Sequence, residues 1–218
     1  MTAMQQKGAE GFLHRFEGLR ERLPGARLPW AAALRDNAAE AFRASGLPTR
    51  RLEAWRYTDL RAVSEAGFDE PLTALDDASG LPPMHGEARA VFVDGRSRAD
   101  LSSLDGVAFA AQSLAANLRE AEGRLGALAR PDEQPLAALN TMLFEDGLVV
   151  AVPAGMSGGV LELLSLASPT ERPSAFHPRH LIRLEAGASL TLIETATGPE
   201  GARYLHNPVF EIEVGEGA

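Results

Sequence analysis

Two stretches of the chain repeat one short pattern, and the second copy ends at the last residue. Residues 182–188 read IRLEAGA and residues 212–218 read IEVGEGA, while a fainter copy, VAVPAG, occupies 150–155. The corresponding glycines are separated by 187 − 155 = 32 and 217 − 187 = 30 residues. Self-similarity at a period of about 20–50 residues is typical of stacked repeat architectures. The chain is therefore expected to contain stacked units of about this length.

The last part of the chain contains short runs of β-forming residues separated by glycine and proline. We expect strands at 148–152, 160–166, 180–185, 190–194 and 209–214. Such runs fit a sandwich, a barrel or a solenoid, and the recurring G-A corner favours the solenoid because glycine permits tight bends between rungs.

Each rung of a solenoid must bury its apolar face on a neighbouring rung. The repeat stops where another strand is expected to begin, so the sequence predicts a fragment of a longer array. The last strand, 209–214, is then expected to be an open edge that promotes self-association.

The first part of the chain has a mainly helical pattern. Apolar spacing predicts helices within 12–23, 30–45, 112–122 and 135–144. A short strand is expected near 90–93, and glycine and proline predict a loop over 71–86. The sequence thus predicts an α+β protein, with a mainly helical domain over 1–146 and the start of a repeat core over 147–218.

Charge and composition argue against several classes of function. The net charge of −9 opposes nucleic-acid binding, which depends on basic contacts to phosphate. The absence of cysteine removes disulfides and thiolate chemistry from these residues. No apolar run approaches the roughly 20 residues that cross a bilayer. We therefore expect a cytoplasmic protein with neither nucleic acid nor membrane as a partner.

The sequence His177-Pro-Arg-His180 contains candidate metal ligands. Residues three apart on a strand face opposite sides, so these imidazoles do not readily share one ion. His180 has the strand parity of Ile182 and Leu184, which favours a structural role. The alternative is a cupin-like metal-binding enzyme using His177, His180 and Glu185, although H-x-x-H departs from the cupin H-x-H spacing.

Residues 48–60, PTRRLEAWRYTDL, combine two large aromatic side chains with three arginines and two acids. In one interpretation, Trp55 and Tyr57 dock against the fold while Arg51 and Glu53 make weak surface contacts. In the other, the segment recognises a partner, because Trp, Tyr and Arg are enriched at interface hot spots. Physical grounds favour docking.

This segment resembles the signature P-x-R-x-x-E-x-W-[KR]-Y-T-[DN]-L of the SufB/SufD family of iron–sulfur cluster assembly proteins, specifically the N-terminal half of its SufD branch. The matching residues are Pro48, Arg50, Glu53, Trp55, Arg56, Tyr57, Thr58, Asp59 and Leu60. Leu52 stands where the family commonly has asparagine. Further blocks resemble the family in the same order, at 91–95, 139–147, 177–188 and 207–215.

The resemblance implies a helical N-terminal region followed by the first rungs of a right-handed parallel β-helix. It also implies a non-catalytic scaffold subunit, not an enzyme, that joins a SufB-like subunit and a SufC-like ATPase in the SufBCD complex of the SUF system. Contacts with both partners are expected mostly beyond residue 218.

The iron–sulfur cluster would belong to the assembled complex, so the resemblance implies no catalytic residue, metal ligand or cofactor within these residues. The signature residues Arg50, Glu53, Trp55, Arg56, Tyr57, Thr58 and Asp59 are the candidate interaction surface. A generic β-solenoid interaction module is the remaining alternative.

Overall fold

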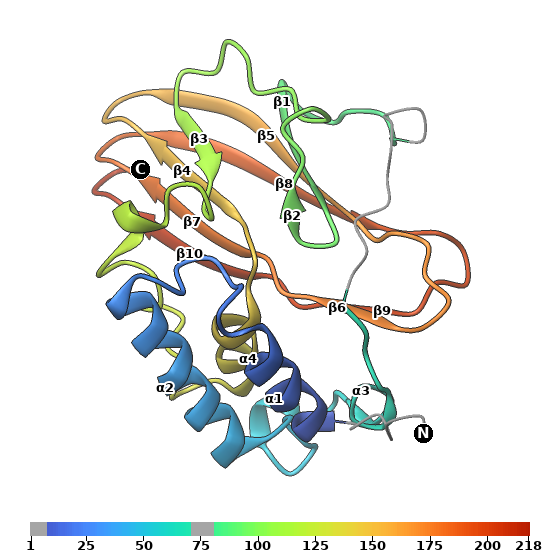
Figure 1. The fold of residues 1–218 in the computed structure, drawn as a ribbon. Coiled ribbons are helices and arrows are strands. Elements are labelled where there is room, and N and C mark those ends of the chain that lie inside the picture. Colours follow the sequence, from blue (N-terminus) through green and yellow to red (C-terminus); the bar gives the residue numbers. More distant parts are fainter. Residues whose placement is uncertain (1–7, 71–80) are drawn as a thin grey trace.

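Three helices lie together on one side of the β-sheets in a computed structural model, which describes residues 8–70 and 81–218 (Figure 1). They are α1 (Gly8–Leu19), α2 (Pro29–Ser45) and α4 (Pro135–Leu143). Their apolar faces share one core, in which Phe12, Phe42 and Met142 are buried. Proline in the first turn of both α2 and α4 suits a position whose backbone N–H needs no helical partner.

The shorter helical elements connect these parts. They are α3 (Arg61–Glu65) and two 3-10 helices, Glu53–Trp55 and Leu118–Ala121. The predicted loop over 71–86 falls partly outside the described residues, and residues 81–86 form no helix or strand. Among the described helices, none is both long enough and apolar enough to cross a bilayer.

The strands form two four-stranded sheets and one two-stranded sheet. They are β1 (Ala88–Val93), β2 (Arg96–Ser97), β3 (Ala110–Ser113), β4 (Leu148–Val152), β5 (Ser157–Leu166), β6 (Ser174–Phe176), β7 (Arg179–Leu184), β8 (Ser189–Thr197), β9 (Tyr204–His206) and β10 (Val209–Val214). The strand orders are β2-β1-β5-β8, β10-β7-β4-β3 and β6-β9. All pairs are parallel except β1 with β2 and β3 with β4.

The repeated sequence pattern corresponds to the strand register. Val150 pairs with Ile182, which pairs with Ile212, so equivalent residues lie 32 and 30 positions apart, as do the repeated glycines. In the other sheets, Ser157 pairs with Ser189 and Ser174 with Tyr204. The stacking of units with this period, predicted from the sequence, is confirmed. The described residues form mixed sheets and no closed barrel.

The predicted helix over 112–122 is wrong. Gln112 and Ser113 instead form the end of β3, which pairs antiparallel with β4. Asp146 Oδ1 then accepts hydrogen bonds from the Ser113 hydroxyl and the Ala115 N–H, at 2.8 and 3.0 Å, and the chain turns. Leu114 and Leu118 are buried on one side of this turn. Their spacing imitates helical periodicity although only a short 3-10 helix forms.

Arg35 anchors α2 to the end of α4. Its guanidinium is buried and donates hydrogen bonds to the carbonyl oxygens of Thr141, Met142 and Phe144, at 3.3, 3.1 and 2.9 Å. These carbonyls lie at the helix end, where backbone acceptors lack helical partners. Burial lowers the pKa of Arg35 to about 9, although Glu145 opposes the shift.

Candidate functional site

His180 occupies an aromatic stack inside the sheets and not a solvent-facing site. Its ring lies edge-on to Phe92 and stacks on Phe210, with centroids 5.4 and 4.7 Å away. Its Nδ1 accepts a hydrogen bond from the Leu148 N–H at 3.0 Å. Burial lowers the pKa of His180 to about 3, with smaller contributions from His206 and Arg179. The ring is therefore neutral at physiological pH and contributes to packing.

His177, directly after β6, and His206, the last residue of β9, also contact aromatic rings. Asn207 Nδ2 lies 3.2 Å from His177 Nδ1, and Phe12 meets the His177 ring edge-on. His206 packs on Phe176 with ring centroids 5.2 Å apart. Burial lowers the pKa of His177 well below its usual value and that of His206 to about 4. His177 is thus an interior residue of the fold, and His206 is half-buried.

The structure does not bring the three cupin-like candidates together. Glu185 is exposed, and its Oε2 accepts the Ala154 N–H at 3.3 Å. His177 and His180, by contrast, are buried against different aromatic rings. Within residues 8–70 and 81–218, no cluster of three or more His, Cys, Asp or Glu side chains is arranged to hold a metal ion.

The signature segment adopts a compact turn between α2 and α3. The Leu52 and Trp55 N–H groups donate to the Thr49 and Leu52 carbonyls, both at 2.9 Å, and lead into the 3-10 helix. Glu53 pairs with Arg56 at 3.2 Å, and the Arg56 guanidinium lies 4.9 Å from the centre of the Tyr57 ring. The turn is therefore stabilised by its own contacts.

At the end of the segment, Asp59 forms contacts with the start of α3. Its Oδ1 accepts the Arg61 N–H at 2.9 Å, and its Oδ2 lies 3.0 Å from Arg61 Nη2. The Arg61 backbone hydrogen bond is the main cause of a lowered pKa for Asp59. The Thr58 N–H donates to the Trp55 carbonyl at 2.9 Å, and the Thr58 side chain is exposed.

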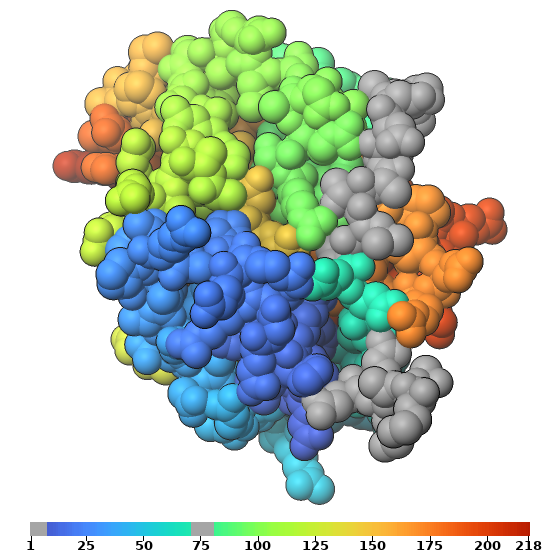
Figure 2. All heavy atoms as spheres, in the orientation of Figure 1, coloured from blue at the N-terminus to red at the C-terminus, as the bar shows by residue number. Residues whose placement is uncertain are grey.

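The prediction that both aromatic side chains of this segment dock against the fold is wrong for Tyr57. The Tyr57 side chain is 85% exposed, Leu52 is 47% exposed, and Trp55 is half-buried. Residues 50–58, light blue to cyan, protrude at the lower end of the molecule, away from the sheets (Figure 2). Leu52 and Tyr57 therefore face solvent, while Trp55 is partly covered.

Two grooves flank this protruding segment. The first, of about 310 Å³, lies between residues 47–51 and 59–64, and its charged lining is Arg50, Arg51, Asp59 and Arg61. The second, of about 500 Å³, lies between residues 52–55 and 133–136. Both volumes fall within the range of about 300–1,000 Å³ that is typical of ligand pockets.

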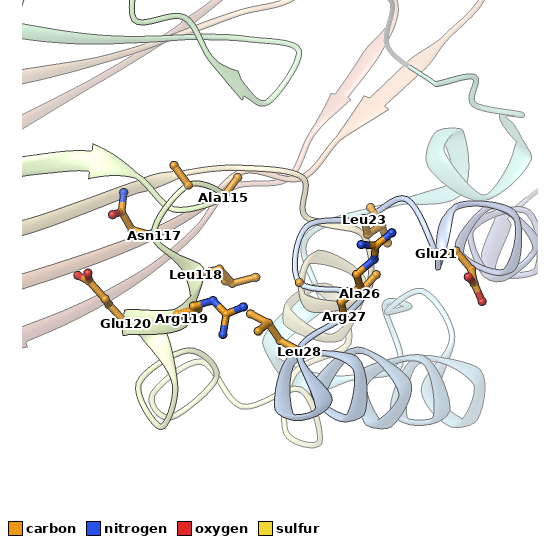
Figure 3. A pocket seen from close by; sticks show the side chains of 12 residues that line it. Glu21, Leu23, Ala26, Arg27, Leu28, Ala115, Asn117, Leu118, Arg119 and Glu120 are labelled. Carbon is orange, nitrogen blue, oxygen red and sulfur yellow. The ribbon is translucent and has the colours of Figure 1, made fainter.

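A further cleft, of about 450 Å³, separates the loop before α2 from residues 115–120 (Figure 3). Arg27 and Arg119 project from its opposite walls, and Glu21 and Glu120 lie at its ends. Arginines and acids balance in this cleft, so its charge favours neither anions nor cations.

Comparison with known proteins places these features in a family. The model of the SufBD protein N-terminal region matches residues 6–78, which include the signature segment. An iron–sulfur cluster assembly SufBD family protein of Synechocystis sp. (strain ATCC 27184 / PCC 6803 / Kazusa) is 30% identical over 203 residues. The match covers 84% of this chain and 45% of that relative, so the chain spans less than half the relative's length. On these two matches, the chain belongs to the SufBD family.

Proposed function

We propose that this chain is a non-catalytic, SufD-like scaffold component of an iron–sulfur cluster assembly system. The observation that carries the proposal is the 203-residue match to a relative whose name describes iron–sulfur cluster assembly. The match covers 84% of this chain, so it extends beyond residues 1–146 into the stacked strands. A scaffold role also suits a chain in which the buried His177 and His180 serve packing and the exposed signature segment combines apolar, aromatic and arginine side chains.

The stacked strands are, in this proposal, the first turns of a right-handed parallel β-helix. Support comes from the burial of equivalent residues along the stack. Val150 is fully buried, Ile182 is 3% exposed and Ile212, the third of the series, is 47% exposed. Burial thus decreases towards β10, which leaves an apolar face suited to cover by a further β layer.

The proposed division places a mainly helical domain over 1–146 and the β-helix core over 147–218, although the strands β1 and β3 of the first part pair with β5 and β4 of the second. We propose a cytoplasmic location and partnership with a SufB-like subunit and a SufC-like ATPase, through contacts mostly outside these residues. The iron–sulfur cluster would be cargo of the assembled complex.

The proposal is tested by tagging the chromosomal gene and purifying its product at natural length. A SufC-like ATPase and a SufB-like protein are expected to co-purify in fixed ratio, and the isolated product should not release sulfide from cysteine. Recovery of the tagged protein with neither partner, from cells that express both, would count against it.

A further inference from the structure

The protruding signature segment exposes apolar side chains that the fold does not require. Leu52 and Tyr57 are among the most exposed large apolar or aromatic side chains of the described residues. They flank a 3-10 helix whose turn is closed by local backbone hydrogen bonds of 2.9–3.3 Å. Large side chains presented on a preorganised turn lose little entropy on binding, so this geometry favours recognition of a partner.

The first groove carries unbalanced positive charge. Asp59 is paired with Arg61, whereas neither Arg50 nor Arg51 pairs with a carboxylate within the part of the chain that the structure describes. Arg50 Nε donates to the Arg56 carbonyl at 3.2 Å, which orients the guanidinium without neutralising it. Arginine forks bind carboxylates through paired hydrogen bonds, so the groove is complementary to acidic side chains.

The second groove, whose lining begins at Leu52 directly after Arg51 of the first, offers an apolar surface. Leu52 and Trp55 form one wall, and Pro135 and Leu136 form the other. The acids at its rim are already neutralised in part, because Glu53 pairs with Arg56 and Glu133 with Arg130, both at 3.2 Å. The groove is therefore suited to an apolar side chain.

We propose that the two grooves together bind an extended segment of a partner protein. The segment places a carboxylate against Arg50 and Arg51 and a nearby large apolar side chain between Trp55 and Leu136. The ligand is a peptide and not a nucleic acid, because the second groove presents apolar side chains, and the net charge of −9 repels a polyphosphate chain more strongly than a segment with one carboxylate. This inference goes beyond the proposed function, since it does not depend on which complex the chain joins.

The test is selection of a displayed library of random peptides on the immobilised protein, followed by fluorescence anisotropy with the enriched peptides. We expect enriched peptides to carry Asp or Glu within a few positions of a large apolar residue. Arg51→Glu and Leu52→Ala should each weaken binding roughly tenfold or more. Both side chains are exposed, so these variants should fold as the parent does.

Matched controls alter similar side chains elsewhere on the surface. Arg119→Glu reverses an exposed charge on the cleft of Figure 3, and Met156→Ala shortens an exposed apolar side chain. Neither should change affinity. Failure to enrich a shared motif overturns the proposal, as does equal loss of affinity in Arg51→Glu and Arg119→Glu. Displacement of the peptides by DNA but not by acidic competitor peptides also overturns it.

Discussion

Arg179 and Glu211 form a buried ion pair between the neighbouring strands β7 and β10, with Nη2 and Oε1 2.6 Å apart. Arg179 Nη1 also donates to Asn140 Oδ1 and Thr141 Oγ1 in α4, at 3.2 and 3.1 Å. Glu211 Oε1 accepts the Gly126 N–H at 2.8 Å. The pair therefore joins the helical region and the loop before α4 to the stacked strands.

Removing one member of this pair should destabilise the fold strongly. Arg179→Met leaves the Glu211 carboxylate buried without its counter-charge, which is expected to cost about 3–5 kcal/mol in the free energy of unfolding. Adding Glu211→Met should recover part of that loss. Urea denaturation of the two single variants and of the double variant measures the coupling free energy between Arg179 and Glu211. Purely additive losses would show that the pair does not act as a unit.

Gly147 lies where no larger residue fits. A Cβ at this position would fall 1.5 Å from the Arg179 carbonyl oxygen. Gly147→Ala should therefore destabilise the protein by at least about 3 kcal/mol, since the neighbouring backbone must shift. Gly18→Ala is the matched control, because Gly18 lies on the exposed side of α1 with no atom near its Cβ position. Thermal unfolding should show a loss for the first and no loss for the second.

The buried histidines predict sensitivity to acid. The pKa values of His180 and His206, about 3 and about 4, lie below the value of 6.5 expected for unfolded chains, as does that of His177. Unfolded molecules therefore bind more protons once the pH falls below about 6.5, so stability decreases from there to about pH 4. Each histidine contributes up to about 1.4 kcal/mol per pH unit.

Urea unfolding between pH 7 and pH 5 measures the loss of stability caused by the histidines. This pH range lies above the one in which protonation of Glu211 changes stability. Burial alone would raise the Glu211 pKa, but Arg179 and backbone N–H groups hold it below its usual value, so its contribution is lost only at lower pH. His206→Phe should reduce the slope by about one proton. A flat stability profile down to pH 5 would contradict the account.

The signature segment should matter little for stability. Tyr57→Ala is expected to change the free energy of unfolding by less than about 0.5 kcal/mol, and Trp55→Ala to cost about 1–2 kcal/mol. Phe42→Ala, at a fully buried site in α2, should cost about 3–5 kcal/mol. If Trp55→Ala proved as costly as Phe42→Ala in calorimetry, the segment would be a core anchor and not a free surface.

The apolar face at β10 should promote association. Ile212 and Val214 are 47% and 60% exposed on β10, which lies at the edge of its sheet. Light scattering is expected to show dimers or larger species that increase with concentration. A double variant with Ile212→Lys and Val214→Lys should reduce the fraction of these species. Met84→Lys, at an exposed site outside the strands, should not reduce them. A monomer at all concentrations would contradict this prediction.

The sequence revealed the period of the stacked units because paired positions on neighbouring strands carry similar side chains. Ile182 and Ile212 carry the same residue type at paired positions, and the 30-residue offset gives their register directly. The strands β6 and β9 escaped prediction because each has only three residues. Residues 112–122 were misread because Leu114 and Leu118 pack on one side of an irregular turn, and apolar spacing does not distinguish that turn from a helix.

The candidate surface illustrates a different limit. Large aromatic residues such as Trp55 and Tyr57 occur both in buried contacts and at exposed interfaces. Their presence in the sequence therefore does not distinguish docking from recognition. Tyr57 is 85% exposed, on a turn that also contains the pair between Glu53 and Arg56. For His180, strand parity with Ile182 favoured a structural role, and the structure buries its side chain.

Depletion of the chromosomal gene product tests the proposed role in iron–sulfur cluster assembly most directly. Cells are depleted under mild iron limitation, and the activity per molecule of an iron–sulfur dehydratase is compared with that of a metal-free enzyme. The account predicts that the first activity falls while the second is unchanged, and that restoring the gene reverses the loss. Unchanged iron–sulfur enzyme activity after complete depletion would contradict it.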